Sequence, residues 1–155
     1  MRVLLLLCLL TGLARAESTR VAKGYRNGRP MNVRVVSVDW TEVEVATARA
    51  FRAMRAAAAR NGINLKLVSG FRTHEKQQQL YREWRRGTGN PAARPGFSNH
   101  QSGRALDISV DSDPIREWLK ANAKRFGFHR TVRNEPWHWE FFGERRRLAR
   151  RPRHR

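Results

Sequence analysis

Two short stretches in the second half of the chain contain residue types that bind metal ions. His100 is followed seven positions later by Asp107, and His138 lies in the segment Asn-Glu-Pro-Trp-His-Trp-Glu at residues 134–140. Two imidazoles and one carboxylate are a ligand set for a catalytic zinc ion, because three protein ligands leave a fourth position for water. Each residue alone is more often a solvated or core side chain, and the aromatic segment also fits a rigid strand with charged edges. The zinc hypothesis therefore requires a fold that brings these three residues together.

Glu135 precedes His138 by three positions and is a candidate general base. In a straight strand, residues three apart face opposite sides, so these side chains converge only if the backbone bends between them. Pro136 favours such a bend, because proline fixes its own φ and keeps the preceding residue out of the helical region. The sequence therefore predicts a turn between Glu135 and His138.

The residues around His138 predict a strand with two distinct faces. Trp137 and Trp139 are expected on the face opposite His138, where they would pack in the core. Glu140 shares the face of His138. We interpret Glu140 as a surface carboxylate or as a partner of a ligand, and not as a ligand itself.

Several other catalytic classes lack their characteristic residues. The only cysteine, Cys8, lies in the N-terminal apolar run, so the rest of the chain has neither a thiolate nucleophile nor a disulfide. The Ser-x-x-Lys and Lys-Thr-Gly motifs of serine D,D-peptidases do not occur, and neither does His-Glu-x-x-His. We interpret His74, His129 and His154 as incidental, with His74 on an exposed helix.

Residues 1–16 are predicted to be a secretory signal peptide. Arg2 is followed by an apolar run at residues 3–10 and by a small-x-small pattern at residues 14–16. The run is short for a bilayer-spanning helix, and a retained N-terminal anchor is the alternative. We therefore expect cleavage after residue 16 and export to the periplasm or the extracellular space.

The chain is strongly basic, with 32 Lys and Arg against 13 Asp and Glu and a formal net charge of +19. Such a charge indicates contact with polyanions without naming them. For an exported protein, anionic cell-wall polymers or lipid head groups are expected, and no specific nucleic acid. The Arg-rich residues 144–155 are predicted to form a disordered tail that attaches loosely to an anionic wall or membrane surface, or that only improves solubility.

The hydrophobic pattern predicts short strands and helices that alternate without a βαβ rhythm. This indicates an α+β fold with a small, largely antiparallel sheet flanked by helices. Residues 17–30 are polar and contain glycine, so we expect a loose lead-in. Strands are predicted at residues 33–38, 65–68, 105–110, 128–131 and 137–142, helices at residues 41–60, 73–85 and 113–126, and a loop at residues 86–97.

Three ordered blocks resemble the zinc D-alanyl-D-alanine carboxypeptidases and related LAS peptidases, including the VanY-like members. They are Ser-x-His-x-x-Gly-x-Ala-x-Asp at residues 98–107, Glu-Pro-Trp-His-Trp-Glu at residues 135–140, and Ser-Gly-Phe-Arg-Thr at residues 69–73, the last followed by Gln77 and Leu-Tyr. The resemblance covers about residues 30–143. It implies a LAS/hedgehog-like fold with a zinc peptidase domain at residues 31–143.

The resemblance also implies roles for individual residues. The residues that match the zinc ligands are His100, Asp107 and His138. Glu135 matches the base that activates a zinc-bound water, and Arg72 matches the arginine that stabilises the developing oxyanion. Polar positions of the substrate cleft are matched by Gln77, Ser98 and Ser102. Two residues depart from the family pattern, Asn99 where many relatives have an acidic residue and Arg104 where an apolar residue is common.

Taken together, the sequence predicts an exported, monomeric zinc metallopeptidase. It would hydrolyse D-amino-acid-containing bonds of peptidoglycan stem peptides, acting foremost as a D-alanyl-D-alanine carboxypeptidase. The alternatives are an L-Ala-D-Glu-type wall endopeptidase, a non-catalytic wall-binding module with structural zinc, and a basic nucleic-acid-binding protein. Which bond is cut depends on the shape of the loop at residues 86–97.

Overall fold

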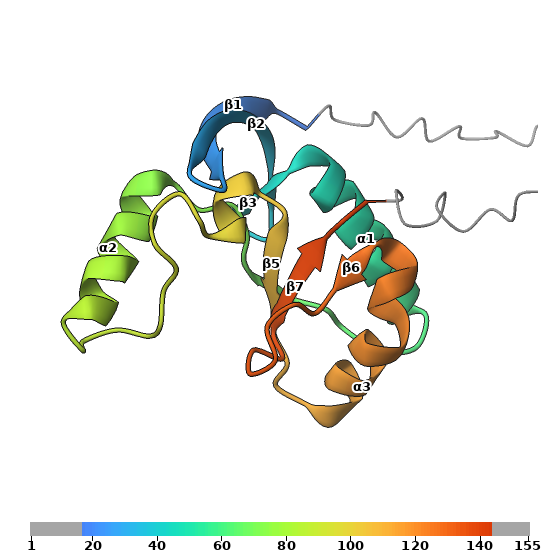
Figure 1. Ribbon diagram of the computed structural model, residues 1–155. Helices are drawn as coiled ribbons and strands as arrows, with labels where there is room; N and C mark the ends of the chain where they lie inside the picture. The colour runs from blue at the N-terminus through green and yellow to red at the C-terminus, as the bar shows by residue number, and fades with distance from the viewer. Residues whose placement is uncertain (1–16, 144–155) are drawn as a thin grey trace, which may run out of the picture.

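Two antiparallel sheets and one helix that packs against both organise the computed structural model, which describes residues 17–143 (Figure 1). The first sheet has the order β1-β2-β3, with β1 Thr19–Arg26, β2 Arg29–Val38 and β3 Thr41–Glu44. The second has the order β4-β5-β7-β6, with β4 Leu67–Ser69, β5 Ala105–Ile108, β7 His138–Phe141 and β6 Phe128–His129. The α+β prediction is confirmed, although the strands form two sheets instead of one.

Three α-helices and two 3₁₀ helices complete the described part of the chain. They are α1 Val45–Ala59, α2 His74–Arg85, α3 Asp113–Asn122, η1 Asn99–Ser102 and η2 Ala123–Phe126. Between residues 17 and 143, no helix is long and apolar enough to cross a membrane. The predicted signal peptide and the Arg-rich tail lie outside the described residues.

The main core lies between α1 and the two sheets. Phe51 and Met54 on the inner face of α1 are fully buried in one cluster with Leu106 and Trp139 of the second sheet and with Val43 of the first. Helical spacing of the apolar residues places these α1 side chains on one face. The second sheet is therefore fixed from behind, while the opposite side of β5 and β7 remains available for polar residues.

Helix α1 begins later than the sequence pattern predicts. Residues 41–44 were expected to be helical, but they pair with β2 as strand β3. Glu44 then caps the helix, because its carboxylate accepts hydrogen bonds from the backbone N–H and the hydroxyl of Thr47 at 2.8 and 2.9 Å. Helix α3 begins at Asp113, as the pattern predicts, and Ser112 occupies its N-cap.

The prediction of a loose lead-in at residues 17–30 is wrong. Strands β1 and β2 pair from Thr19↔Val36 to Arg26↔Arg29 and form a long hairpin. Its two-residue turn is Asn27-Gly28, with φ of 51° and 77°. Both values are those of a type I′ turn, which matches the twist of the flanking strands. The polar composition of this segment therefore reflects a half-exposed hairpin and not a disordered linker.

The inner face of this hairpin packs on η1 and on the end of β4. Ala22, Val33, Val35 and Phe71 form a second small core there. Gly24 of β1 approaches so closely that a Cβ atom would lie 2.4 Å from the Gln101 carbonyl oxygen. Only glycine fits this contact without displacing η1.

Replacing Gly24 by alanine should therefore push η1 away from the hairpin. We expect Gly24→Ala to lower the free energy of unfolding by about 1–3 kcal/mol, the usual range for overpacking. Chemical denaturation measures this value. The control is Asn32→Ala, on the exposed side of β2, which should change it by less than about 0.5 kcal/mol. Equal values for the two variants would contradict the close packing of Gly24.

Candidate metal centre and active site

His100, Asp107 and His138 come from three different elements and meet in one cluster. One possible ligand atom from each lies within 4.8 Å of the others, and the two imidazole centroids are 5.1 Å apart. Asp107 and His138 are direct partners in the antiparallel pairing of β5 with β7, so their side chains share one face of the sheet. His100 reaches the same point from η1. The fold thus meets the condition on which the zinc hypothesis depends.

The orientation of His100 is fixed by a backbone carbonyl. Its Nδ1 lies 2.8 Å from the Gly70 carbonyl oxygen, and its Nε2 lies 3.4 Å from Asp107 Oδ1. A carbonyl only accepts hydrogen bonds, so Nδ1 carries the proton and donates it to Gly70. Nε2 is therefore the ring nitrogen that faces the cluster, and it can act as a metal ligand once it carries no proton.

His138 is oriented by a carboxylate on each side of its ring. Nδ1 lies 3.1 Å from Asp107 Oδ1, and Nε2 lies 3.4 Å from Glu140 Oε1. Glu140 is 9% exposed and also accepts hydrogen bonds from Asn99 Nδ2, at 2.8 Å, and from the Thr131 hydroxyl. Nδ1 of His138 is therefore the atom that faces the cluster, while Glu140 holds the far side of the ring.

Charge strongly couples Asp107 and His138 in the metal-free protein. Burial alone would lower the pKa of His138, but its hydrogen bonds to Asp107 and Glu140 outweigh burial and raise the pKa from 6.5 to about 9. Burial would likewise raise the pKa of Asp107, but hydrogen bonds from His100 and His138 hold that pKa well below its ordinary value. The imidazole of His138 is therefore protonated on both nitrogens, and positively charged, at neutral pH when no metal is bound.

A tight turn brings Glu135 next to His138, as the sequence predicts. The His138 N–H donates to the Glu135 carbonyl at 3.1 Å, with Pro136 at the second turn position that proline favours. Glu135 Oε2 lies 3.8 Å from His138 Nδ1. The turn also corrects the prediction for Trp137, which is 43% exposed because β7 begins only after it, whereas Trp139 is buried as expected.

Arg72 enters the same site from the segment after β4. Its backbone N–H donates to the His100 carbonyl at 3.1 Å, and its Nη1 donates to Gln77 Oε1 at 3.0 Å. Burial lowers the pKa of Arg72, while the charges of Asp107 and Glu135 oppose this change. The guanidinium thus lies within electrostatic range of both acids and retains further N–H donors.

Gln77 is completely buried, and both ends of its amide have partners inside the protein. Oε1 accepts from Arg72, and Nε2 donates to the Ala93 carbonyl at 2.7 Å. The structure thereby links α2, Arg72 and the loop at residues 86–97. A direct contact between Gln77 and substrate stays a prediction.

Ser98 and Ser102 lie at the two ends of η1, both largely buried. The Ser102 hydroxyl donates to the Asn99 carbonyl at 2.9 Å, and Ser98 is the N-cap residue of η1. The Ser102 hydrogen bond stabilises the segment that carries His100, whereas the Ser98 side chain makes no capping hydrogen bond. Their predicted contact with substrate is a separate matter and stays a prediction.

Sequence reasoning missed several residues that support the site. Gly70 contributes only a carbonyl oxygen, and Asn99 and Thr131 act through Glu140. His74, which was interpreted as incidental and exposed, is partly buried, stacks on Tyr25 with ring centroids 4.3 Å apart, and has Nδ1 3.3 Å from Gln101 Nε2. Only the position of Asn99 beside His100 gave a local signal.

The donor set suits zinc. Two imidazole nitrogens and one carboxylate oxygen converge, and each imidazole has its other nitrogen engaged by an oxygen of the protein. Three protein ligands leave one position open, which is typical of catalytic and not of structural zinc. His100, Asp107 and His138 therefore form a site that zinc fits, with Glu135 and Arg72 beside it.

Comparisons with known proteins agree with this geometry. The family model for VanY, described as D-alanyl-D-alanine carboxypeptidase, matches residues 41–144. A D-alanyl-D-alanine carboxypeptidase of Enterococcus faecalis is 34% identical over 116 residues, which cover 56% of this chain and 43% of that protein. A peptidoglycan L-alanyl-D-glutamate endopeptidase of Bacillus subtilis, CwlK, is 40% identical over 60 residues, which cover 37% and 36%. The chain spans less than half the length of these curated relatives.

Solved structures give the same result over a larger part of the chain. VanYB in complex with D-alanine-D-alanine superposes with a TM-score of 0.66 and 27% identity, covering 77% of this chain and 82% of that one. A mutant of the vancomycin resistance D,D-pentapeptidase VanY in complex with Zn(II) has a TM-score of 0.63 and 26% identity, covering 76% and 83%. The likeness therefore extends over most of residues 17–143.

Zinc must displace the proton from His138 in order to bind. Because the pKa of His138 in the metal-free protein is about 9, the apparent zinc affinity should rise about tenfold per pH unit between pH 7 and pH 9 and then level off. Competition with a chelator of known affinity measures this dependence. Calorimetry in two buffers of different ionisation enthalpy should show that binding releases a proton. An affinity that is constant from pH 7 to pH 9 would contradict this description of His138.

Proposed function

The chain belongs to the VanY family of D-alanyl-D-alanine carboxypeptidases, and from this premise we propose that it hydrolyses D-amino-acid-containing bonds of peptidoglycan stem peptides. Removal of a terminal D-alanine is the reaction we favour. The observation that carries the proposal is the convergence of His100, Asp107 and His138 beside an acidic and a basic side chain. That arrangement supplies a metal site, a base and an electrophile within one cluster of side chains.

A zinc ion held by these three ligands would act as a Lewis acid toward the scissile carbonyl and toward water. Glu135, with a side chain that is 36% exposed and 3.8 Å from His138 Nδ1, is accessible to a water molecule that approaches the cluster. It would accept the proton of the attacking water and later transfer it to the departing amine. The partial exposure of Glu135 suits this role, because both exchange partners come from solvent or substrate.

Arg72 would stabilise negative charge that develops on the carbonyl oxygen of the substrate. A guanidinium that is fixed before the reaction begins is more effective than a mobile one, because it needs no reorganisation in the transition state. Gln77 supports this role, since its Oε1 accepts a hydrogen bond from Arg72. We therefore assign Gln77 to the positioning of Arg72.

The main alternative is cleavage within the stem peptide, and it rests on the likeness to the L-alanyl-D-glutamate endopeptidase CwlK. The two reactions differ in whether the cleft closes around a free substrate carboxylate. The loop at residues 86–97 borders α2 and is attached to it through Gln77 and Ala93, so its shape is expected to decide this choice. A wall-binding module with structural zinc would not need a base beside an open metal position.

Export of the protein and monomeric function are also part of the proposal. The signal-like residues 1–16 support delivery to the periplasm or the extracellular space, where peptidoglycan lies. The Arg-rich residues 144–155 would hold the enzyme near an anionic wall or membrane surface. Neither segment contributes a residue to the proposed reaction.

Substitution of Glu135 by glutamine tests the reaction directly. Glu135→Gln keeps the size of the side chain but removes the base, so kcat/KM on a D-Ala-D-Ala-terminated stem peptide should fall by about 10²–10⁴. The zinc content should remain unchanged. Mass spectrometry of the products distinguishes loss of terminal D-alanine from a split stem. Near-normal turnover by this variant would remove Glu135 from its role. Glu117→Gln on the exposed side of α3 is the matched control.

Substitution of Gln77 tests the positioning of Arg72. Gln77→Met retains bulk but removes the hydrogen bond to Arg72, so kcat should fall by about 10- to 100-fold while the zinc content stays the same. Gln78→Met, one position further along α2, is the control and should retain activity. If Gln77→Met changed only the KM, a direct contact between Gln77 and substrate would be the better explanation.

A further inference from the structure

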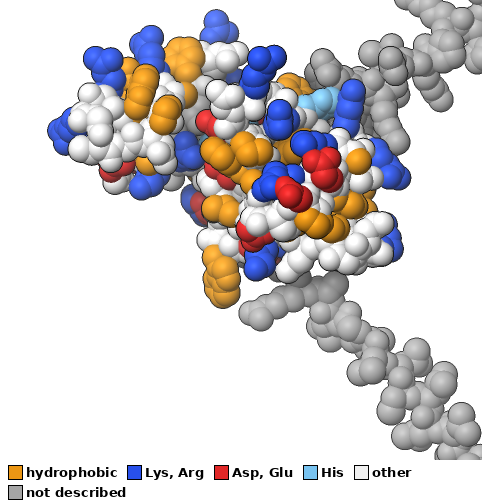
Figure 2. Space-filling model, turned by 90° about the horizontal axis from the view of Figure 1, so that it is seen from below, with side chains coloured by type: hydrophobic (Ala, Val, Ile, Leu, Met, Phe, Trp, Pro, Cys, Tyr) orange, Lys and Arg blue, Asp and Glu red, His pale blue; other side chains and the backbone are white. Residues whose placement is uncertain are grey.

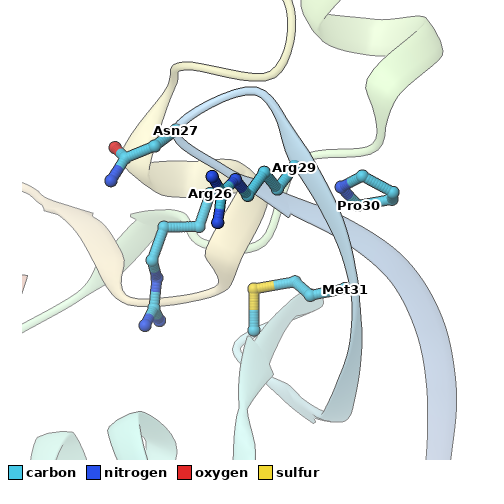
Figure 3. A pocket seen from close by; sticks show the side chains of 5 residues that line it. All are labelled: Arg26, Asn27, Arg29, Pro30 and Met31. Atoms are coloured by element: carbon cyan, nitrogen blue, oxygen red, sulfur yellow. The ribbon is translucent and has the colours of Figure 1, made fainter.

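A pocket of about 480 Å³ opens at the tip of the β1–β2 hairpin, and none of its lining residues belongs to the proposed active site. Figure 3 shows its lining, Arg26, Asn27, Arg29, Pro30 and Met31. Arg26 and Arg29 are direct partners across the hairpin. Their side chains extend from the same side of it as Met31 (Figure 3). Two guanidinium groups therefore reach one concave part of the surface.

The two arginines of this pocket form no ion pair with an acid among residues 17–143. Arg26 and Arg29 form neither a side-chain hydrogen bond nor an ion pair there. Burial and the nearby charge of Arg104 lower the pKa of Arg26, and only the charge of Glu44 opposes them. The Glu44 carboxylate is already engaged by Thr47. Like charges placed opposite each other destabilise a strand pair unless an anion compensates them.

Within residues 17–143, the arginines that form ion pairs with acids all lie outside the hairpin pocket. The pairs are Arg20–Glu42, Arg52–Glu17, Arg55–Asp39 and Arg116–Asp113. Figure 2 shows one face on which Lys and Arg side chains lie along the outline and also beside the Asp and Glu side chains nearer the centre. Basic side chains are thus widespread, and the hairpin pocket differs from them by being concave and lacking acids in its lining.

The chemistry of the lining favours a phosphate group over a carboxylate. One carboxylate satisfies a single guanidinium through two parallel hydrogen bonds, whereas a phosphate has enough oxygens and charge to be shared by two. Pro30 and Met31 add an apolar wall that suits the carbon skeleton next to such a group. Among the residues that the structure describes, the lining includes no aromatic ring on which a nucleobase would stack.

We propose that this pocket binds the phosphate groups of a polyol-phosphate or sugar-phosphate chain, as found in anionic polymers. Arg26 and Arg29 donate hydrogen bonds to the phosphate oxygens, and Pro30 and Met31 contact the adjoining carbon chain. The inner face of the same hairpin supports η1 through Gly24. Occupancy of the pocket thus neutralises the repulsion at the hairpin tip and stabilises the segment on which η1 rests.

Titration of the full chain with inorganic phosphate and with a short glycerol-phosphate oligomer tests this proposal at constant ionic strength. We expect saturable shifts of the Arg26 and Arg29 side-chain NMR signals and at least tenfold tighter binding of the oligomer. Arg26→Gln/Arg29→Gln should weaken oligomer binding at least tenfold. It should leave kcat/KM on a short soluble stem peptide unchanged, which also shows that the variant folds.

The matched control is Lys23→Gln/Arg34→Gln, which removes the same charge from the opposite face of the hairpin and should retain oligomer affinity. Equal weakening in both double variants would reduce the effect to general electrostatics and overturn the proposal. Tighter binding of single-stranded DNA or of anionic lipid vesicles through Arg26 and Arg29 would also overturn it. The binding measurements do not depend on peptidase activity, so failure here is distinguishable from failure of the proposed reaction.

Discussion

The carboxylate of Asp107 between two imidazoles is the interaction on which the site depends. It lies 3.4 Å from His100 Nε2 and 3.1 Å from His138 Nδ1, so it draws together two elements that are separated in sequence. In the metal-free protein the attraction between Asp107 and protonated His138 takes the place of metal bonds. This contribution to stability is complete below pH 6.5 for His138 and is lost as the pH rises through about 9. The Asp107 contribution is present above pH 3.8 and is lost on acidification below it.

The N-terminal hairpin is part of this arrangement, because it holds η1 from the outside. Gly24 packs against the Gln101 backbone. On the other side of η1, the Gly70 carbonyl accepts a hydrogen bond from the His100 ring, and the Arg72 backbone N–H donates to the His100 carbonyl. The segment that carries His100 is thus clamped between the hairpin and the end of β4. A 3₁₀ helix of four residues has little intrinsic stability. Its geometry is therefore set by tertiary contacts. The position of His100 as a metal ligand depends on those contacts.

Local sequence patterns predicted the elements with strong hydrophobic periodicity and the site residues that lie within recognisable motifs. Helix α2 and the turn at Pro136 follow from nearby residues, and the convergence of the three ligand candidates followed from the motif blocks. The hairpin of β1 and β2 was not predicted, although Asn27-Gly28 is a strong turn signal. The polar, glycine-containing composition of residues 17–30 favours a loop. The support of His138 by Glu140 and Asn99 was not predictable in detail, since it joins residues 41 positions apart in the sequence.

Charge balance explains why a basic surface and an acidic active site occur in one protein. Around the ligands lie Asp107, Glu135 and Glu140 against Arg72. A divalent cation bound to neutral imidazoles would compensate the remaining negative charge, so the loaded site would exert little long-range force on an anionic substrate. Any attraction to a polyanionic wall would then come from residues outside the site, in a chain whose formal net charge is +19. Surface charge would bring the enzyme to its polymer, and the loop at residues 86–97 beside the metal site would select the bond.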